Sequence, residues 1–548
     1  MIQNKRISRI IALVLACIMT VMMLAGCTSS SSKDKDKNAI NTEFVDEDNR
    51  IDDKYGTCYQ VLLYSFCDSD GDGIGDIQGL ISKLDYIQDM GFSSIWLLPF
   101  NKSTSYHKYD VVDYYTVDPQ YGTMEDFEAL VKACDERGLD IYMDFVINHT
   151  SSKCEWFKEA CEYLSTIGDG EPDASVCPYV DYYNFKKTDK VASGWKKVSG
   201  NPDWTYECVF WAQMPDLNLS SKAVRAEIEK IAKFWIDKGV SGFRLDAALH
   251  YFEADNPDSI EALTWFCDYV HGVNPDIYCV AEVWDNLNTI KQFYQSSCDS
   301  MFDFAIGNQD GIIVKGVNNN SDDKSGAKMA ENIVNVYNEI KSVNENAIDG
   351  IFLSNHDVGR AAGFLLRKDE RVKLAAGIQI LTTGNVFVYY GDELGMGGSG
   401  KDENKRAPMY WSDDASAQGM TAGPPSYEPQ THTFGSYETQ KDDEYSVCNY
   451  YKKAIHIRNK YPEIGRGVPT VMSDVAEQNG NICAIHKTYN DSEISLIYND
   501  SDAAVTVTVS KDTYKYENVA DYLVVNEELP EIDGEKITIP AYGCVILK

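Results

Sequence analysis

The sequence has little positive charge and no paired-cysteine motif. Against 85 acidic residues it carries only 50 lysines and arginines, so its formal net charge is −35. A surface this negative repels phosphate backbones, and nucleic acid is therefore not an expected partner. The 15 cysteines form no CxxC pair and no zinc-type spacing, so they give no sequence sign of a zinc finger. We see no internal repeat and no Ser/Thr/Pro-rich stalk.

Long apolar runs are also absent, except at the amino terminus. There, basic residues precede an apolar run at 10–23, and "LAGC" follows it. This pattern is typical of a secretory signal, and it resembles a bacterial lipoprotein processing site. We expect a signal peptide at 1–26, lipidation of Cys27, a flexible tether at 27–52 and a location on the cell surface. The alternative is an uncleaved anchor helix, for which the run is short.

The pairing of the cysteines stays open at this point. Export would permit disulfides. Four cysteines lie close enough in sequence for a bridge, namely Cys154, Cys161, Cys177 and Cys208. Four others fall in apolar, strand-like runs, where we expect buried free thiols: Cys58, Cys279, Cys483 and Cys544.

Short apolar segments alternate with helical stretches over most of the chain. Eight segments are predicted strands: 59–66, 94–100, 141–147, 242–247, 278–284, 301–305, 351–357 and 386–393. Their interiors are continuously apolar, as in parallel strands that are covered on both faces. Apolar residues recur at helical spacing over 221–239. Eight strand–helix repeats predict an α/β protein built on a closed (β/α)8 TIM barrel.

Two segments depart from this repeat. About 70 residues separate the third and fourth strands, which is too long for a loop and predicts an inserted small domain at 150–217. From 464 to 548 the pattern changes to short alternating runs, which predict a C-terminal antiparallel β-sandwich. The barrel would then occupy 53–149 and 218–463.

Polar residues end several of the predicted barrel strands. The third ends with His149, the fourth with Arg244 and Asp246, the fifth with Glu282, and the seventh with His356 and Asp357. Barrel enzymes place their active sites at these carboxyl ends. Carboxylates gathered with arginine and histidine favour glycoside hydrolysis, which needs a nucleophile and a proton donor.

The same segments resemble the signature regions of glycoside hydrolase family 13, the α-amylase family. They read "DFVINH", "GFRLDAALH", "AEVWD" and "FLSNHD", in the family's order. A fifth region, "MPDLN", resembles the group intermediate between oligo-1,6-glucosidases and neopullulanases, which contains α-amylases. The resemblance implies an α-amylase acting on starch and maltooligosaccharides, with a covalent intermediate and retained α configuration.

The resemblance also assigns roles. Asp246 is the expected nucleophile, Glu282 the general acid/base and Asp357 the third carboxylate, which grips sugar hydroxyls. Substrate would be bound by five residues: Tyr109, His107, His149, Arg244 and His356. A retaining enzyme should hold its two catalytic carboxyls about 5–5.5 Å apart.

Two departures and several alternatives accompany this interpretation. Leu249 precedes His250 where relatives often carry lysine, so binding of the leaving sugar is in doubt. Val386 replaces a usual proline, with little expected consequence. The alternative activities are those of an oligo-α-1,6-glucosidase, a neopullulanase-type enzyme or a transglycosylase. A more remote alternative is a non-catalytic glucan-binding barrel. We expect a monomer.

Residues 68–76, "DSDGDGIGD", crowd four aspartates into nine positions. An EF-hand would require glutamate at its twelfth position, where Gly79 stands. In the resembled family a matching loop binds one calcium ion. By that match we expect the ligands to be Asp68, Asp70, Asp72, Asp76 and the carbonyl of Ile74. The other interpretation is a solvated acidic turn.

Overall fold

The computed structural model describes residues 53–252, 256–319 and 324–548. The predicted signal peptide, Cys27 and the tether lie outside these residues. No helix within the described ranges is long and apolar enough to cross a membrane.

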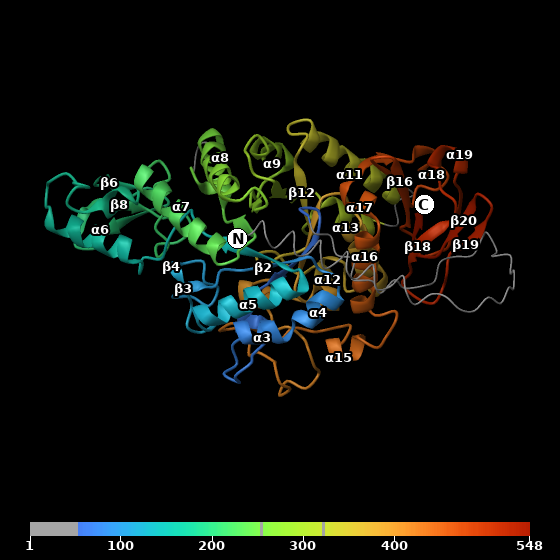
Figure 1. The fold of residues 1–548 in the computed structure, drawn as a ribbon, viewed down its shortest axis with the longest axis horizontal. Coiled ribbons are helices and arrows are strands. Elements are labelled where there is room, and N and C mark those ends of the chain that lie inside the picture. The colour runs from blue at the N-terminus through green and yellow to red at the C-terminus, as the bar shows by residue number, and fades with distance from the viewer. Residues whose placement is uncertain (1–52, 253–255, 320–323) are drawn as a thin grey trace, which may run out of the picture. The chain divides into compact units, whose positions relative to one another are not determined.

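Eight parallel strands form a closed barrel, which confirms the predicted fold class; β2 and β12 of this barrel are labelled in Figure 1. In chain order they are β1 (Thr57–Val61), β2 (Ser94–Leu97), β5 (Asp140–Phe145), β9 (Gly242–Leu245), β10 (Tyr278–Ala281), β11 (Ser300–Phe302), β12 (Ile348–Phe352) and β13 (Asn385–Tyr389). Each lies within or overlaps one predicted segment. β1 pairs with β13 and with β2, which closes the barrel.

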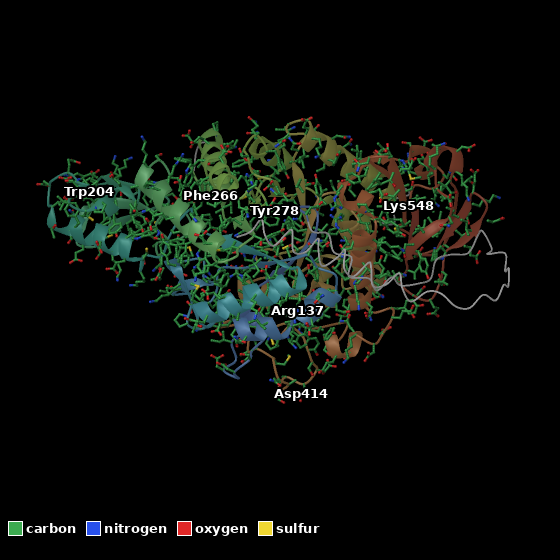
Figure 2. The ribbon with its side chains drawn as sticks, viewed as in Figure 1. Arg137, Trp204, Phe266, Tyr278, Asp414 and Lys548 are labelled. Carbon is green, nitrogen blue, oxygen red and sulfur yellow. The ribbon has the colours of Figure 1, made fainter. Side chains whose placement is uncertain are left out.

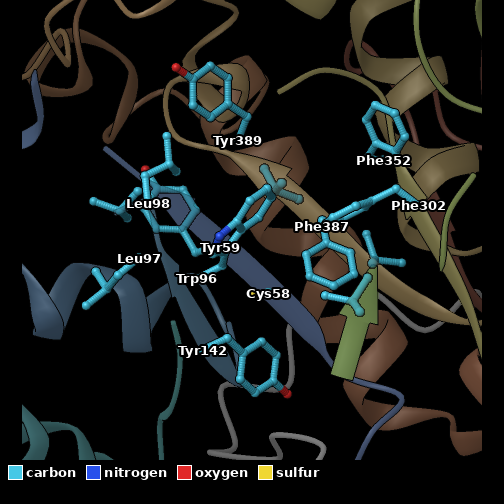
Figure 3. Packing of buried hydrophobic residues seen from close by; sticks show 14 of the residues in the cluster. Cys58, Tyr59, Trp96, Leu97, Leu98, Tyr142, Phe302, Phe352, Phe387 and Tyr389 are labelled. Atoms are coloured by element: carbon cyan, nitrogen blue, oxygen red, sulfur yellow. The ribbon is translucent and has the colours of Figure 1, made fainter. Parts of the chain in front are cut away.

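Large apolar side chains fill the barrel, as Figure 3 shows. Trp96 stacks on Phe302 with ring centroids 5.2 Å apart, and Phe302 meets Phe387 edge to face at 4.9 Å. All three are buried. Aromatic pairs in these geometries add to the apolar burial that holds the strands together. The barrel is therefore a packed core, and any substrate site must lie at one of its ends.

Helices follow most barrel strands. The helices of the barrel region are α2 (Leu63–Phe66), α3 (Ile77–Ser82), α4 (Leu84–Asp89), α5 (Met124–Arg137), α7 (Lys222–Asp237), η2 (Ala248–His250), α8 (Asn256–Val273), α9 (Leu287–Phe293), α10 (Ile312–Asn318), α11 (Ser325–Lys341), α12 (Ala361–Phe364), α13 (Asp369–Ile380), η3 (Asp392–Leu394), α14 (Asp402–Lys405), α15 (Tyr437–Gln440), α16 (Val447–Lys460) and α17 (Pro462–Arg466). α7 buries its predicted apolar face and is capped by Ser221, which accepts from the Val224 N–H. The first predicted strand was too long, because residues 63–66 form α2.

The segment between β5 and β9 folds into its own small elements. These are α6 (Glu155–Thr166), η1 (Pro178–Asp181) and a three-stranded sheet of β6 (Phe185–Lys187), β7 (Trp195–Val198) and β8 (Asn201–Glu207). Trp204, labelled in Figure 2, is buried on β8. A hairpin of β3 (Asn101–Ser103) and β4 (Val111–Val117) lies between β2 and α5.

Two antiparallel sheets end the chain. One contains β14 (Val468–Val471), β15 (Ile482–Tyr489), β16 (Ser492–Asn499), β21 (Cys544–Leu547) and β18 (Val519–Leu523); the other contains β17 (Val505–Thr508), β20 (Lys536–Ile539) and β19 (Glu531–Asp533), with α18 (Ser473–Ala476) and α19 (Lys511–Tyr514) beside them. Ile497 of the first sheet and Ile537 of the second share one buried cluster. Antiparallel sheets are therefore present where the sequence predicts them, at 464–548.

All 13 cysteines of the described ranges are free thiols. The sulfurs that sequence proximity left open for pairing, from Cys154 to Cys208, are not bridged. Cys58, Cys279, Cys483 and Cys544 are buried, as their apolar surroundings predict.

Candidate active site

Arg244 lies at the centre of a buried polar cluster at the carboxyl ends of the barrel strands. Its Nη1 donates to Asp246 Oδ1 at 2.5 Å and to Asp144 Oδ1 at 2.8 Å. Its Nη2 lies 3.0 Å from Glu282 Oε2. The guanidinium is 1% exposed. One buried cation therefore holds both predicted catalytic carboxylates.

The local backbone explains how these side chains meet. Asp246 and Glu282 directly follow β9 and β10, which are adjacent in the barrel. Ala247 adopts a left-handed conformation with φ 50°, which is uncommon for a residue with a side chain. This turn lets the Ala247 N–H donate to Glu282 Oε2 at 3.2 Å. Strained backbone of this kind is typical of functional sites.

The two carboxyl oxygens of Glu282 differ in their hydrogen bonding. Oε2 receives the Ala247 N–H and Arg244, while Oε1 is buried and has no hydrogen-bond partner among the described residues. Burial raises the pKa of Glu282 to about 8; Arg244 opposes this shift, and the Asp246 and Asp357 carboxylates add to it. The side chain therefore holds a proton near neutral pH, with a free oxygen to carry it.

Asp357 has the opposite electrostatic setting. Its Oδ1 accepts from Arg406 Nη2 at 2.7 Å, and its Oδ2 lies 3.0 Å from His356 Nε2. Burial would raise the pKa of Asp357, but His356 and Arg406 outweigh it and hold this pKa below its ordinary value. Two carboxyl groups in one site thus favour different protonation states, which is how acid and base roles are separated in enzymes.

The predicted substrate-binding rings meet at the same site. Tyr109 Oη donates to Asp144 Oδ2 at 2.9 Å, and its ring stacks on His356 at 5.4 Å. Burial lowers the pKa of His149 and His356, and burial together with Arg406 lowers that of His107 to about 4. These neutral imidazoles can donate to or accept from hydroxyl groups.

A cavity of about 510 Å³ opens over these groups. Its lining includes the predicted residues His107, Tyr109, His149, Asp246, Glu282 and Asp357. His149 Nε2 is buried without a partner among the described residues. Arg244 and His356 lie beneath, bonded to the lining carboxylates. The structure therefore brings all eight predicted catalytic and substrate-binding residues together.

Comparison with known proteins decides the family. Residues 60–467 match the family described as "Alpha amylase, catalytic domain". The chain belongs to the α-amylase family of glycoside hydrolases.

Relatives and solved structures agree with this assignment. The chain is 35% identical over 496 residues to Alpha-amylase 3 of Dictyoglomus thermophilum, covering 89% of this chain and 92% of that protein. Oligo-1,6-glucosidase of Bacillus cereus is 26% identical over 571 residues, covering 90% and 99%. The structure of Eubacterium rectale Amy13B superposes with a TM-score of 0.87 at 42% identity, covering 93% of this chain and 97% of that one.

Three residues of this α-amylase-family site were missed in the sequence. Asp144 bonds Arg244, Tyr109 and the Trp96 Nε1. Its signal was a charge inside the apolar segment "IYMDFVI". Gln60 Nε2 bonds the second nitrogen of the His356 ring, at 2.8 Å. Arg406 lies in a loop beyond β13, where sequence gave no sign of its role.

The acidic loop gathers three of its four aspartates. Carboxylate oxygens of Asp68, Asp70 and Asp76 all lie within 4.8 Å of one another, whereas Asp72 is not part of this group. Asp72 instead accepts from the Ile74 N–H at 2.7 Å. Backbone N–H groups of the loop bond the other three carboxylates as well, for example the Gly73 N–H to Asp68 Oδ2 at 2.7 Å, so the ligand role of Asp72 stays a prediction. The other three offer the hard oxygen donors that calcium prefers, and so they fit that ion.

Proposed function

We propose that this chain is an exported, retaining α-amylase that cleaves α-1,4-glucosidic bonds of starch and maltooligosaccharides. One observation carries the proposal: Arg244 binds both Asp246 and Glu282, and burial raises the pKa of Glu282 so that it can hold a proton. A nucleophilic carboxylate beside a protonated carboxylic acid is the pair that glycosidic cleavage requires. Product analysis on starch, with Asp246→Asn as the control, tests it.

In the first step Asp246 attacks the anomeric carbon of the bound sugar. Glu282 Oε1 gives its proton to the glycosidic oxygen, the bond to the leaving sugar breaks, and a covalent ester forms on Asp246. Arg244 orients the attacking carboxylate, because its Nη1 bonds Asp246 Oδ1. In the second step Glu282 takes a proton from water, which displaces Asp246 and restores the α configuration.

Asp357 and the histidines position the sugar in this proposal. Asp357 stays ionised beside Arg406 and can accept from two sugar hydroxyls. His149 offers its unpartnered Nε2 to another hydroxyl. Hydrogen bonds of this kind strengthen as the ring flattens toward its oxocarbenium-like transition state.

Product analysis would distinguish cleavage of α-1,4 bonds from cleavage of α-1,6 bonds. Relatives include proteins named alpha-amylase and oligo-1,6-glucosidase, so the family alone does not choose between them. We favour α-1,4 cleavage because identity is higher to the protein named alpha-amylase. Maltooligosaccharides released from starch, with isomaltose left intact, would support it. Hydrolysis of isomaltose faster than maltotriose would favour the oligo-α-1,6-glucosidase alternative.

The pH profile should follow Glu282. Because only its protonated form donates, kcat/KM on maltooligosaccharides should fall about tenfold per pH unit above the Glu282 pKa of about 8. Initial rates across alkaline pH measure this limb. In Glu282→Gln, assayed on a substrate whose leaving group needs no proton, the limb should vanish. An alkaline limb that persists in that variant would contradict the assignment.

Trp284 should contribute to binding of longer glucans. It lines the cavity, is 47% exposed and stacks on Phe304 with centroids 5.2 Å apart. A rigid exposed ring two residues after Glu282 can pack against a sugar on the leaving side. Trp284→Ala should raise KM for maltoheptaose roughly two- to tenfold with little change in kcat. An unchanged KM would remove this role.

We also propose that the acidic loop binds calcium through Asp68, Asp70, Asp72, Asp76 and the carbonyl of Ile74, since oxygens of Asp68, Asp70 and Asp76 already lie within 4.8 Å of one another. Bound calcium would neutralise carboxylates that otherwise repel one another. Asp76 is also the N-cap of α3, because its side chain accepts from the Gly79 N–H. The loop is thereby joined to the first barrel helix, and its role in this proposal is stability rather than chemistry.

Calcium removal should therefore lower Tm and spare turnover. At calcium 100-fold above its Kd the expected stabilisation is about 2.7 kcal/mol. Asp70→Asn should abolish the calcium dependence of Tm, and Asp72→Asn should weaken it. Thermal melts with and without chelator, beside initial rates at low temperature, measure both. Loss of turnover at unchanged Tm would contradict this division.

Three further proposals concern membrane attachment, oligomeric state and nucleic-acid binding. The amino-terminal pattern supports lipidation of Cys27 and attachment to the outer face of a bacterial membrane. Radiolabelled lipid incorporation, lost in Cys27→Ser, tests it. We further propose that the enzyme is a monomer and binds no nucleic acid, as its charge of −35 supports.

A further inference from the structure

A histidine, a cysteine and an aspartate meet at the amino-terminal end of the barrel strands. Cys279 is the second residue of β10, Asp299 directly precedes β11, and His271 lies near the end of α8. Tyr278, labelled in Figure 2, marks the start of β10. Glu282 follows the other end of the same strand, so this group is separate from the cavity. The proposed glycosidase mechanism does not use it.

The spacing of the three side chains suits a small divalent metal ion. One ligand atom from each residue lies within 4.8 Å of the others. His271 Nε2 lies 3.2 Å from Asp299 Oδ2. In a tetrahedral zinc site, with zinc–nitrogen and zinc–oxygen distances near 2.0–2.1 Å, two such ligands lie about 3.3 Å apart. The hydrogen bond between His271 and Asp299 has nearly this length, so a metal ion could take its place.

Neighbouring groups fix the orientation of Asp299. Its Oδ1 accepts from Lys54 Nζ at 2.7 Å, and its Oδ2 accepts from the Cys279 N–H at 2.9 Å. The Cys279 Sγ lies within 4.8 Å of ligand atoms of both His271 and Asp299. Asp299 Oδ2 is thus turned toward the other two ligand atoms. Outer contacts of this kind hold the ligands of metal sites in place.

The three side chains differ in their exposure to solvent. Cys279 is fully buried, whereas the side chains of His271 and Asp299 are 23% and 16% exposed. An ion can therefore enter from solvent past the histidine and aspartate. The Cys298 Sγ donates to the Cys279 carbonyl at 3.4 Å, so it remains a thiol and supports the strand.

We propose that His271, Cys279 and Asp299 bind one zinc ion, with water as the fourth ligand. Thiolate, imidazole and carboxylate together favour zinc over calcium, which takes oxygen donors alone. The ion would join α8, β10 and the start of β11 at the base of the barrel. It would stabilise the fold there without contacting substrate.

Zinc titration of the purified, chelator-treated protein tests this proposal. Saturating calcium is kept present so that zinc does not occupy the acidic loop. We expect one zinc per chain and a rise in Tm. His271→Ala and Cys279→Ser should weaken the Kd by more than the roughly 10- to 100-fold that loss of a supporting outer group costs. Kd is measured by competition with a chromogenic chelator.

Cys58→Ser is the matched control. Cys58 is a buried free thiol and the second residue of β1, as Cys279 is of β10. Its zinc Kd should equal that of the unaltered protein. Asp70→Asn, in the acidic loop, should also bind zinc unchanged. Equal weakening in Cys58→Ser and Cys279→Ser would show a general folding effect and overturn the assignment.

Cobalt provides a readout that does not depend on variant folding. Co²⁺ bound to the unaltered protein should show a thiolate-to-cobalt charge-transfer band and the d–d bands of a tetrahedral ion. Zinc should displace both. His271→Ala, changed at a partly exposed helix position, should lose the tetrahedral bands. Cobalt spectra without a sulfur band, or a zinc Kd equal in His271→Ala and the unaltered protein, would show that the three residues form a metal-free hydrogen-bonded group.

Discussion

Asp246→Asn is expected to lower kcat/KM on maltoheptaose by at least about 10⁴-fold. The amide cannot form the covalent ester, so the two-step route is lost. The fold should survive, because Arg244 keeps its bonds to Asp144 and Glu282. Single-turnover and steady-state rates measure the loss, and a thermal melt confirms that the variant is folded.

Asp237→Asn is the control for this change. Asp237 is an exposed residue of α7 that pairs with Lys233, and its substitution should leave the rate unchanged. If folded Asp246→Asn kept even a tenth of the activity, Asp246 would not be the nucleophile.

Glu282→Gln is expected to lower kcat on maltooligosaccharides by about 10²–10⁴-fold, the usual contribution of a general acid. The loss should be much smaller for a substrate such as an α-maltosyl fluoride, because fluoride leaves without a proton. The Ala247 N–H and Arg244 can still bond the glutamine oxygen, so the site geometry should persist. Rates on the two substrates, compared in one variant, separate proton donation from binding.

Azide gives a second test of the same residue. With Glu282 neutral, the small anion can attack the covalent intermediate without base assistance, so it should restore turnover and give an α-glycosyl azide. An equal loss on both substrates, with no azide product, would contradict the acid/base role of Glu282.

The barrel was predictable because its signal is repeated eight times. Apolar strands alternate with helices, and each predicted strand overlaps an observed one. The errors lie at the strand ends, where local turns decide. Residues 63–66 are apolar enough for a strand, yet they form α2 and turn the chain toward the acidic loop.

The carboxylates that face the cavity were predictable from the sequence, whereas the residues that bond to them from behind were not. Asp246, Glu282 and Asp357 stand in recognisable segments at strand ends. Arg406 directly follows α14, beyond the last barrel strand, and reaches Asp357 only through tertiary folding. The ligand role of Asp72 stays a prediction, because its carboxylate accepts a backbone N–H just as that of Asp68 does.

No short zinc-binding motif in the sequence marks the cysteine–histidine–aspartate group, and the reason is physical. Its members come from a helix and two neighbouring strand positions, 8 and 20 residues apart. Short cysteine motifs indicate metal sites whose ligands lie on one turn of the chain. The ligands of this group are instead brought together by the parallel register of β10 and β11.

The central claim is that Asp246 forms a covalent bond to the sugar. A fluorinated glucosyl fluoride, which slows breakdown of the intermediate, should label the protein with one sugar per chain. Peptide mass spectrometry should place that sugar on Asp246, and the first product released from maltoheptaose should be the α anomer by NMR. A label on another residue, or a β-anomeric first product, would contradict the account.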